Sequence, residues 1–174
     1  MSAPHARGPL VRPVEAPARS LRQLAYADPA AFPVLLDSSA LGALGRCSIL
    51  GAYPQAALWL DGAGLHADAA AAPHTAGCSG FLDALQSAWR SEAAAQGGTG
   101  APGPFHGGWM VFLGYELAAE VEPQLSLPRA GGGALQAPAA FALRIPAAMV
   151  FDHQQEQAWL VAESGREALL ADLE

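Results

Sequence analysis

The sequence contains no lysine, and its nine basic residues are all arginine. A P-loop lysine that binds phosphate, a lysine that forms a Schiff base and a lysine general base are therefore all excluded. The 16 acidic residues give a formal net charge of -7, and the sequence has no cluster of the basic residues that a nucleic-acid surface requires. We therefore expect neither lysine-dependent catalysis nor nucleic-acid binding.

Cysteine is scarce as well. The two cysteines, Cys47 and Cys78, belong to no CxxC motif, so neither a disulfide framework nor a structural zinc site is indicated, and two isolated buried thiols are the simpler interpretation. The five histidines show none of the spacings HxxxH, HExxH or HxE followed by CxxC. We expect no metal site in this chain.

Long apolar runs are missing too. The best candidate, residues 137–151, is interrupted by Arg144 and Pro146 and falls short of the roughly 20 apolar residues that span a bilayer. The first 20 residues lack the continuous apolar segment of a secretory signal. With 52% apolar and only 14% charged residues, the chain is expected to be globular rather than disordered. We predict a soluble, cytoplasmic protein with a flexible lead-in over residues 1–19 and one domain over residues 20–174.

Local patterns predict short strands with a few helices between them. Strands are expected at residues 32–36, 46–53, 57–60, 65–67, 109–113, 141–151 and 158–163. Helices are expected at 20–27, 79–95 and 115–117, and from about 166 to the end of the sequence. Glycine-rich residues 61–64 and the turn at 152–157 should close two hairpins, while 96–104 and 124–139 should be exposed connectors. Antiparallel hairpins with separate helices indicate an α+β fold.

Two of these elements carry further expectations. The helix at 79–95, with Ser79 as its N-cap, places Leu82, Leu85, Trp89 and Ala93 on one face, which should be the buried face. The strand at 109–113 is apolar throughout, so it should be buried on both faces.

Four motifs resemble the amino-terminal domain of the chorismate-using enzymes anthranilate synthase component I and aminodeoxychorismate synthase component I. They are the Leu-Leu-Asp-Ser of residues 35–38, the Arg-Cys-Ser of 46–48, the Gly-Gly to Gly-Tyr-Glu-Leu stretch of 107–117, and the Val-Phe-Asp-His-Gln of 150–154. Cys47 stands where that family usually has an aromatic residue. The order of a helix, an Asp-Pro turn and the first strand is more similar to the aminodeoxychorismate branch.

The resemblance implies the amino-terminal part of a layered α/β/β/α fold. It implies no catalytic residue and no cofactor in this chain, because chorismate and Mg²⁺ bind in a carboxy-terminal catalytic domain whose motifs this sequence lacks. The implied partners are that chorismate-binding domain, a glutamine amidotransferase component II and L-tryptophan. The tryptophan pocket of the family corresponds here to Leu36, Asp37, Ser38, Arg46, Cys47, Ser48 and Ile49.

Other interpretations of these residues stay open. The same strands could serve only as sheet core, with Arg46 paired to Asp37 in a surface ion pair. Asp152 and His153 are typical of a hydrogen-bonded turn, and Glu116 with Glu120 of a solvated helix face. Three functions follow. The first is a non-catalytic portion of aminodeoxychorismate synthase, an enzyme that makes a precursor of p-aminobenzoate and folate; as a fragment, this chain would be inactive alone. The alternatives are the same portion of anthranilate synthase and a free-standing amino-acid-binding module.

Overall fold

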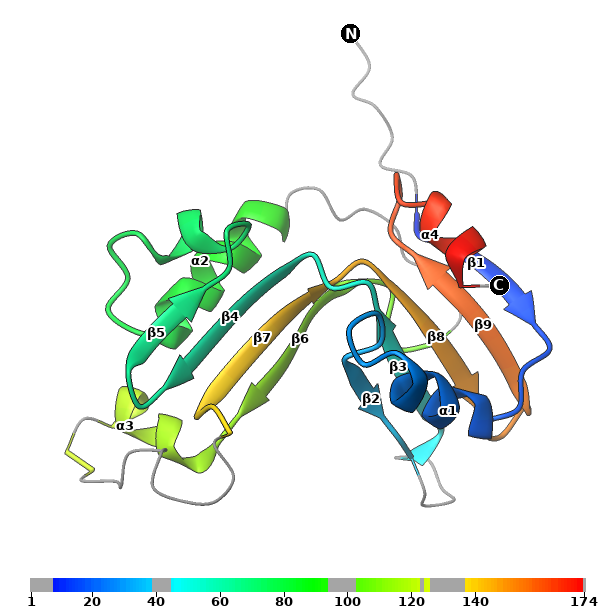
Figure 1. Ribbon diagram of the computed structural model, residues 1–174, viewed down its shortest axis with the longest axis horizontal. Coiled ribbons are helices and arrows are strands. Elements are labelled where there is room, and N and C mark those ends of the chain that lie inside the picture. Colours follow the sequence, from blue (N-terminus) through cyan, green and yellow to red (C-terminus); the bar gives the residue numbers. More distant parts are fainter. Residues whose placement is uncertain (1–7, 39–44, 94–102, 123, 126–136, 174) are drawn as a thin grey trace, which may run out of the picture. The chain divides into compact units, whose positions relative to one another are not determined.

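The computed structural model describes residues 8–38, 45–93, 103–122, 124–125 and 137–173 (Figure 1). It confirms the α+β class, with two antiparallel sheets and flanking helices. The strands are β1 Leu10–Val14, β2 Val34–Leu36, β3 Cys47–Ala52, β4 Ala56–Asp61, β5 Gly64–Ala67, β6 Gly108–Leu113, β7 Ala140–Ile145, β8 Ala147–Asp152 and β9 Gln157–Ala162. The helices are α1 Arg19–Ala27, α2 Phe81–Ala93, α3 Ala118–Val121 and α4 Ala168–Asp172, with the 3-10 helices η2 Ala72–Thr75 and η3 Tyr115–Leu117.

The chain divides into two compact units, each built around one sheet. The first unit contains the described residues of 1–54, 95–108 and 145–174, and its strand order is β1-β9-β8-β3-β2. The second contains the described residues of 55–94 and 109–144, and its order is β5-β4-β7-β6. Much of the two connectors predicted at 96–104 and 124–139 lies outside the described residues.

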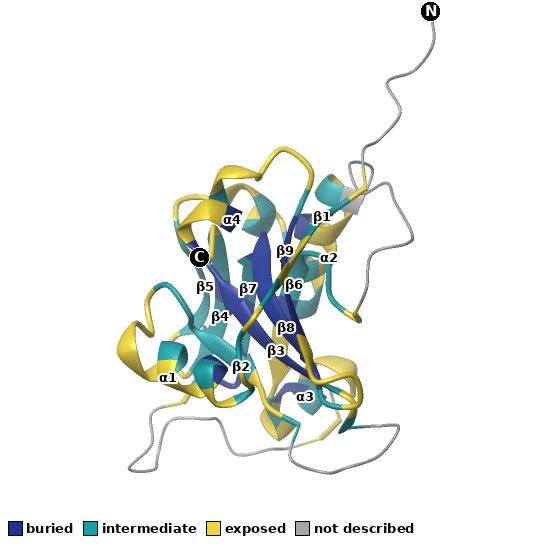
Figure 2. Cartoon of the chain, turned by 90° about the vertical axis from the view of Figure 1, so that its right-hand side faces the viewer, coloured by how far each residue is buried: buried dark blue, intermediate teal, exposed yellow. Residues whose placement is uncertain are grey.

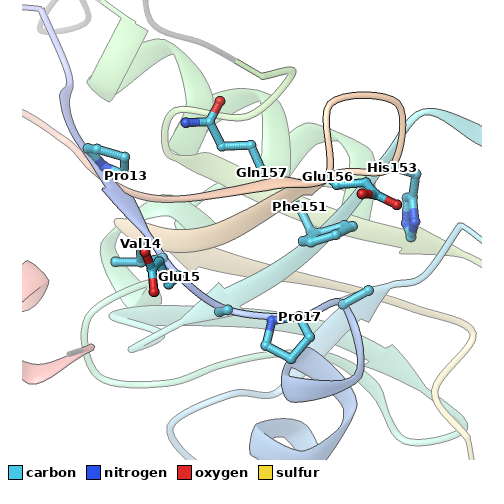
Figure 3. Close-up of a pocket in the computed structure, with 10 residues that line it drawn as sticks. Pro13, Val14, Glu15, Pro17, Phe151, His153, Glu156 and Gln157 are labelled. Atoms are coloured by element: carbon cyan, nitrogen blue, oxygen red, sulfur yellow. The ribbon is translucent and has the colours of Figure 1, made fainter.

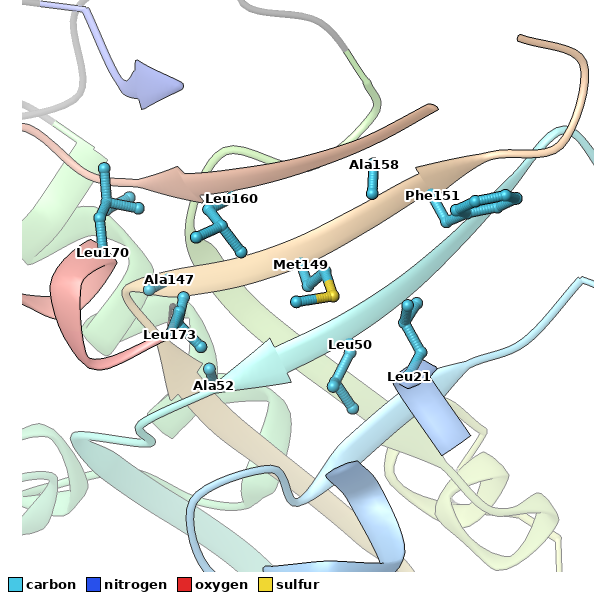
Figure 4. Close-up of a cluster of buried hydrophobic side chains, with 11 residues drawn as sticks. Leu21, Leu50, Ala52, Ala147, Met149, Phe151, Ala158, Leu160, Leu170 and Leu173 are labelled. Carbon is cyan, nitrogen blue, oxygen red and sulfur yellow. The ribbon is translucent and has the colours of Figure 1, made fainter. Parts of the chain in front are cut away.

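The core of the first unit lies between its sheet and the helices α1 and α4. Strands β3, β8 and β9 are its most buried elements (Figure 2), and neighbouring strands cover both edges of each. Leu50 of β3, Met149 of β8 and Leu160 of β9 share one face of the sheet, as the alternation of side chains requires (Figure 4). Leu21 of α1 and Leu170 of α4 are buried against this face. The short helices are therefore held by packing rather than by their own helix propensity.

Strand β1 corrects the lead-in predicted for residues 1–19. Residues 10–14 pair with β9 over five positions, from Leu10 opposite Ala162 to Val14 opposite Ala158. Pro13 concealed the strand in the sequence, since proline cannot donate to a ladder and is usually found at sheet edges. β1 is such an edge.

Pro146 corrects a second prediction. The single strand expected at 141–151 is two strands, β7 and β8, which belong to different sheets. Pro146 lies between them and its carbonyl accepts the backbone N–H of Glu163 at 2.9 Å. Because proline has no N–H, the ladder is interrupted at this residue, which an apolar pattern alone does not reveal.

Helix α2 covers one face of the second sheet through different residues from those expected. Phe81, Ala84 and Ala88 are fully buried, whereas Trp89 is 57% exposed. These three residues have the spacing of one helix face. Two of them are alanines, whose small side chains allow the helix to approach the sheet closely. The prediction was wrong for Trp89, whereas Leu82 and Leu85 are half-buried and pack against the same core as expected. The side chain of Ala93 lies outside the described residues.

The start of α2 is capped by a distant carboxylate. The backbone N–H groups of Phe81 and Leu82 donate to the two oxygens of Glu120, at 2.9 and 3.1 Å, while the Ser79 hydroxyl donates to Asp83. An acidic group is favourable here because it satisfies free donors at the positive end of the helix dipole. Glu120 is therefore a capping residue, although it and Glu116 are exposed, as the predicted solvated face requires. The predicted Ser79 cap is corrected.

The remaining elements agree with their predictions except at two points. Strand β6 buries Met110 but leaves Val111, Phe112 and Leu113 exposed by 44%, 44% and 54%, so it is not buried on both faces. The last helix, expected from about Arg166 to the end of the sequence, runs only from Ala168 to Asp172. The hairpins β4–β5 and β8–β9 and the pairing of β2 with β3 are confirmed.

Candidate functional site

A buried serine joins three strands of the first unit. Ser48 of β3 is 1% exposed, and its hydroxyl donates to the carboxylate of Asp37 at 3.0 Å and accepts the backbone N–H of Ser38 at 3.0 Å. The Nε2 atom of His153, just after β8, lies 2.7 Å from the same hydroxyl. An ionised Asp37 carboxylate can only accept, so we assign the single Ser48 proton to this contact and the donor role in the other contact to Nε2 of His153.

This arrangement differs from that of a nucleophilic serine. In an activated serine the imidazole accepts the hydroxyl proton and a carboxylate orients the imidazole. Here the carboxylate of Asp37 contacts the serine, and the imidazole of His153 donates to it. The cluster of Asp37, Ser48 and His153 therefore connects the ends of β2, β3 and β8.

Asp37 is also tied to helix α1. Its Oδ2 atom lies 2.5 Å from Nε of Arg22, whose side chain is 60% exposed. The hydrogen bond from Arg22 lowers the pKa of Asp37, and the bond from Ser48 acts in the same direction. The predicted ion pair between Arg46 and Asp37 was thus wrong, because Asp37 pairs with Arg22.

Arg46 pairs with Asp152 instead. Its Nη2 and Nε atoms lie 2.6 and 2.7 Å from Oδ2 of Asp152, a side chain that is 3% exposed. The other oxygen of Asp152 accepts the backbone N–H groups of Gln154 and Gln155, at 2.8 and 3.1 Å. Arg46 and these N–H groups lower the pKa of Asp152. The hydrogen-bonded turn predicted at this point is confirmed.

The seven residues predicted for a tryptophan pocket are close in space but divide between the two faces of the sheet. Asp37 and Ser48 lie on the face that α1 covers. Leu36 pairs with Ile49 on the opposite face, where alternation also places Cys47. Leu36 is 53% exposed, and burial raises the pKa of the Cys47 thiol. Ser38 lies beyond the end of β2 and donates its hydroxyl to the Cys47 carbonyl at 2.8 Å.

A groove of about 1050 Å³ opens on the helix side of the same sheet (Figure 3). None of the seven predicted residues lines it. Its lining consists of Pro13, Val14, Glu15, Ala16, Pro17, Ala18, Phe151, His153, Glu156 and Gln157. The sequence patterns missed this groove because six of its ten lining residues lie in the segment interpreted as a lead-in.

The described part of the chain holds no cluster of three or more histidine, cysteine, aspartate or glutamate side chains suited to a metal ion. Among the described helices, none is long and apolar enough to cross a membrane.

The two antiparallel sheets with their helices belong to a known α+β fold, which comparison with solved structures identifies. The crystal structure of anthranilate synthase component I from Streptococcus pneumoniae TIGR4 is similar over 92% of this chain and 35% of that protein, with a TM-score of 0.51 and 22% sequence identity. No family model matches the sequence, and no curated protein matches it significantly. The chain therefore has the fold of part of anthranilate synthase component I and spans little more than a third of that protein's length.

Proposed function

We propose that this chain is an amino-terminal, non-catalytic portion of a chorismate-using enzyme, of the aminodeoxychorismate synthase component I type. The observation that carries the proposal is the shared fold, which extends over 92% of the chain. The sequence motifs add to it, since they lie on β2, β3, β6 and β8 of that fold.

The segment before β2 supports the aminodeoxychorismate branch. Helix α1 ends at Ala27, and the side chain of Asp28 then accepts the backbone N–H groups of Ala30 and Ala31, at 3.1 and 3.0 Å. This Asp-Pro turn leads into β2. The order of helix, Asp-Pro turn and strand is the feature that resembles the aminodeoxychorismate branch. In the proposed role the whole enzyme combines chorismate with ammonia from a glutamine amidotransferase subunit, and chorismate and Mg²⁺ bind outside this chain.

An apolar surface on the second unit is suited to contact with the catalytic domain. Its exposed apolar side chains are Val111 and Leu113 on one face of β6, Phe112 on the other face beside Phe141, and Tyr115 and Val121 on the elements that follow, of which Tyr115 is 79% and Val121 is 68% exposed. Large apolar side chains gathered on neighbouring elements are typical of a surface that another protein part covers. We expect the isolated chain to associate through this surface, and a monodisperse monomer on gel filtration would count against its being an interface.

Growth tests distinguish the candidate functions. Deletion of the gene in its host should produce a requirement for p-aminobenzoate. A requirement for tryptophan instead would assign the chain to the anthranilate branch. Growth without either supplement, in a strain with no second copy of the pathway gene, would refute both enzyme roles and leave a free-standing binding module.

We further propose that β2 and β3 contribute to a tryptophan pocket through Leu36, Ser38, Cys47 and Ile49, with Asp37, Arg46 and Ser48 supporting them. Leu36 is exposed, and a pocket that other parts of the enzyme complete desolvates its ligand poorly when they are missing. Calorimetric titration of the chain with L-tryptophan should therefore show weak binding or none. Micromolar binding that Ser38→Ala abolishes would favour the binding module.

A further inference from the structure

The groove beside β1 has two walls, both in the first unit. One is the segment from Pro13 to Ala18, which leads from β1 into α1. The other is formed by the end of β8 and the start of β9, with Phe151, His153, Glu156 and Gln157. Pairing of Val14 with Ala158 fixes the distance between the walls, and the two prolines of the first wall restrict its backbone. The groove is therefore largely preformed.

Most of the groove surface is apolar, and its apolar groups gather around Phe151. The Phe151 ring meets the His153 ring edge-on, at 5.0 Å between centroids and an angle of 71°. Pro13, Val14 and Pro17 come from the opposite wall (Figure 3). A flat or chain-like apolar body fits between such walls.

The polar groups of the lining are chiefly hydrogen-bond acceptors. Its charged residues are Glu15 and Glu156, and no arginine lines the groove. His153 belongs to the same lining, and its Nε2 atom lies 2.7 Å from the Ser48 hydroxyl. Figure 3 shows the Glu156 carboxylate at the same end of the groove as the His153 ring. A positive group is attracted to this end, while a carboxylate is repelled from it.

We propose that this groove binds a small organic cation, namely a primary amine on an apolar body without a carboxylate. The amine donates to Glu156 at the His153 end, and the apolar body packs against Phe151 and the proline wall. The site is separate from the proposed tryptophan pocket, since they share no residue and the ligand chemistry differs.

The turn that presents Glu156 does not itself need a glutamate. Glu156 has a φ of +51°, in the left-handed region that glycine adopts without penalty and other residues rarely occupy. This backbone conformation does not depend on the carboxylate, so Glu156→Gln should leave the turn unchanged.

The test is a titration of the full 174-residue chain with phenethylamine, followed by calorimetry and by amide chemical shifts. L-phenylalanine and hydrocinnamate carry the same ring with a zwitterionic and an anionic head, respectively. We expect phenethylamine to bind roughly tenfold more tightly than phenylalanine, because the added carboxylate faces Glu15 and Glu156. Hydrocinnamate should not bind, and shifts should be confined to the groove residues.

Two variants separate the groove from general attraction to an acidic protein. Glu156→Gln keeps the shape and should weaken phenethylamine binding roughly tenfold, the loss expected for one charge-assisted hydrogen bond. Glu122→Gln removes an exposed carboxylate of the second unit and should leave binding unchanged. No binding of phenethylamine, equal binding of all three compounds, or equal losses in the two variants would overturn the proposal. Because none of these results involves tryptophan or growth, they are independent of the proposed function.

Discussion

Substitution of Ser48 by alanine should destabilise the first unit by more than the small size of the change suggests. The hydroxyl is 1% exposed and makes three contacts, with Asp37, with the backbone N–H of Ser38 and with His153. Alanine leaves the space nearly filled but removes the hydroxyl proton that Asp37 accepts and the hydroxyl oxygen that the Ser38 N–H and His153 share. The cost therefore comes from polar groups that lose their partners.

The magnitude follows from these contacts. A hydrogen bond to a charged group contributes about 1.5–3 kcal/mol, a neutral one about 1 kcal/mol, and an unsatisfied buried donor costs about 1–3 kcal/mol. The sum overestimates the effect, because Ser38 and His153 are only half-buried and can recruit water in the variant. We expect a loss of about 2 kcal/mol, which corresponds to a decrease of roughly 1 M in the urea midpoint.

Urea unfolding followed by circular dichroism measures this loss, and hydrogen exchange of the β3 and β8 amides localises it to the first unit. Ser164→Ala, at an exposed position in the same unit, is the matched control and should change stability by less than about 0.5 kcal/mol. If Ser48→Ala changed stability no more than this control, or if exchange accelerated in β4 and β5 rather than in β3 and β8, the cluster would not hold the three strands together.

Three further perturbations have expected outcomes. Glu156→Gly should stabilise the chain by about 1 kcal/mol in thermal unfolding, because glycine accepts the positive φ, whereas Glu156→Ala should not. Glu120→Ala should lower stability by about 1 kcal/mol and speed amide exchange in the first turn of α2, while Glu122→Ala, two residues further on, should do neither. The pKa of Asp152 is lowered in the folded chain, so its contribution to the free energy of unfolding is fully present above the ordinary value of 3.8 and is lost as the pH falls through the lower folded value. Asp152→Asn should therefore be less stable than the unchanged chain at pH 7. Between pH 4 and pH 2 the variant should lose less stability than the unchanged chain does. An unchanged acid dependence in Asp152→Asn would contradict this pairing.

The elements that the sequence predicted well depend on local signals. Strands β4 and β5 are joined by Gly62 and Ala63, and the φ of Gly64 is +127°, so the turn chemistry alone specified that hairpin. Helix α1 has Leu21 and Leu24 at helical spacing before the Asp-Pro turn. In both cases the deciding residues lie within a few positions of one another.

The features that the sequence did not predict depend on contacts between distant residues. Arg46 and Asp152 are 106 positions apart, and only the register that places Cys47 opposite Asp152 brings them together. Asp37, the nearer carboxylate in the sequence, was the natural partner to expect for Arg46. Glu120 likewise reaches α2 from 39 positions away. Local propensity contains no information about such pairs, because they form only after the sheets have assembled.

The division of the predicted site residues between two sheet faces has a consequence for function. Alternation along β3 directs Ser48 to the helix side, where it contacts His153 of the groove wall, and Cys47 and Ile49 to the other side, where the proposed tryptophan pocket lies. Strand β3 therefore supports the groove indirectly, through His153, and would contribute side chains to the pocket directly. Each ligand would then contact a different set of side chains on a shared backbone. A change that removes one side chain, such as Glu156→Gln, should affect only the ligand on its own face. A change that loosens the shared strands, such as Ser48→Ala, should weaken the binding of any ligand on either face, because both sites depend on the same pairing of β3 with β2 and β8.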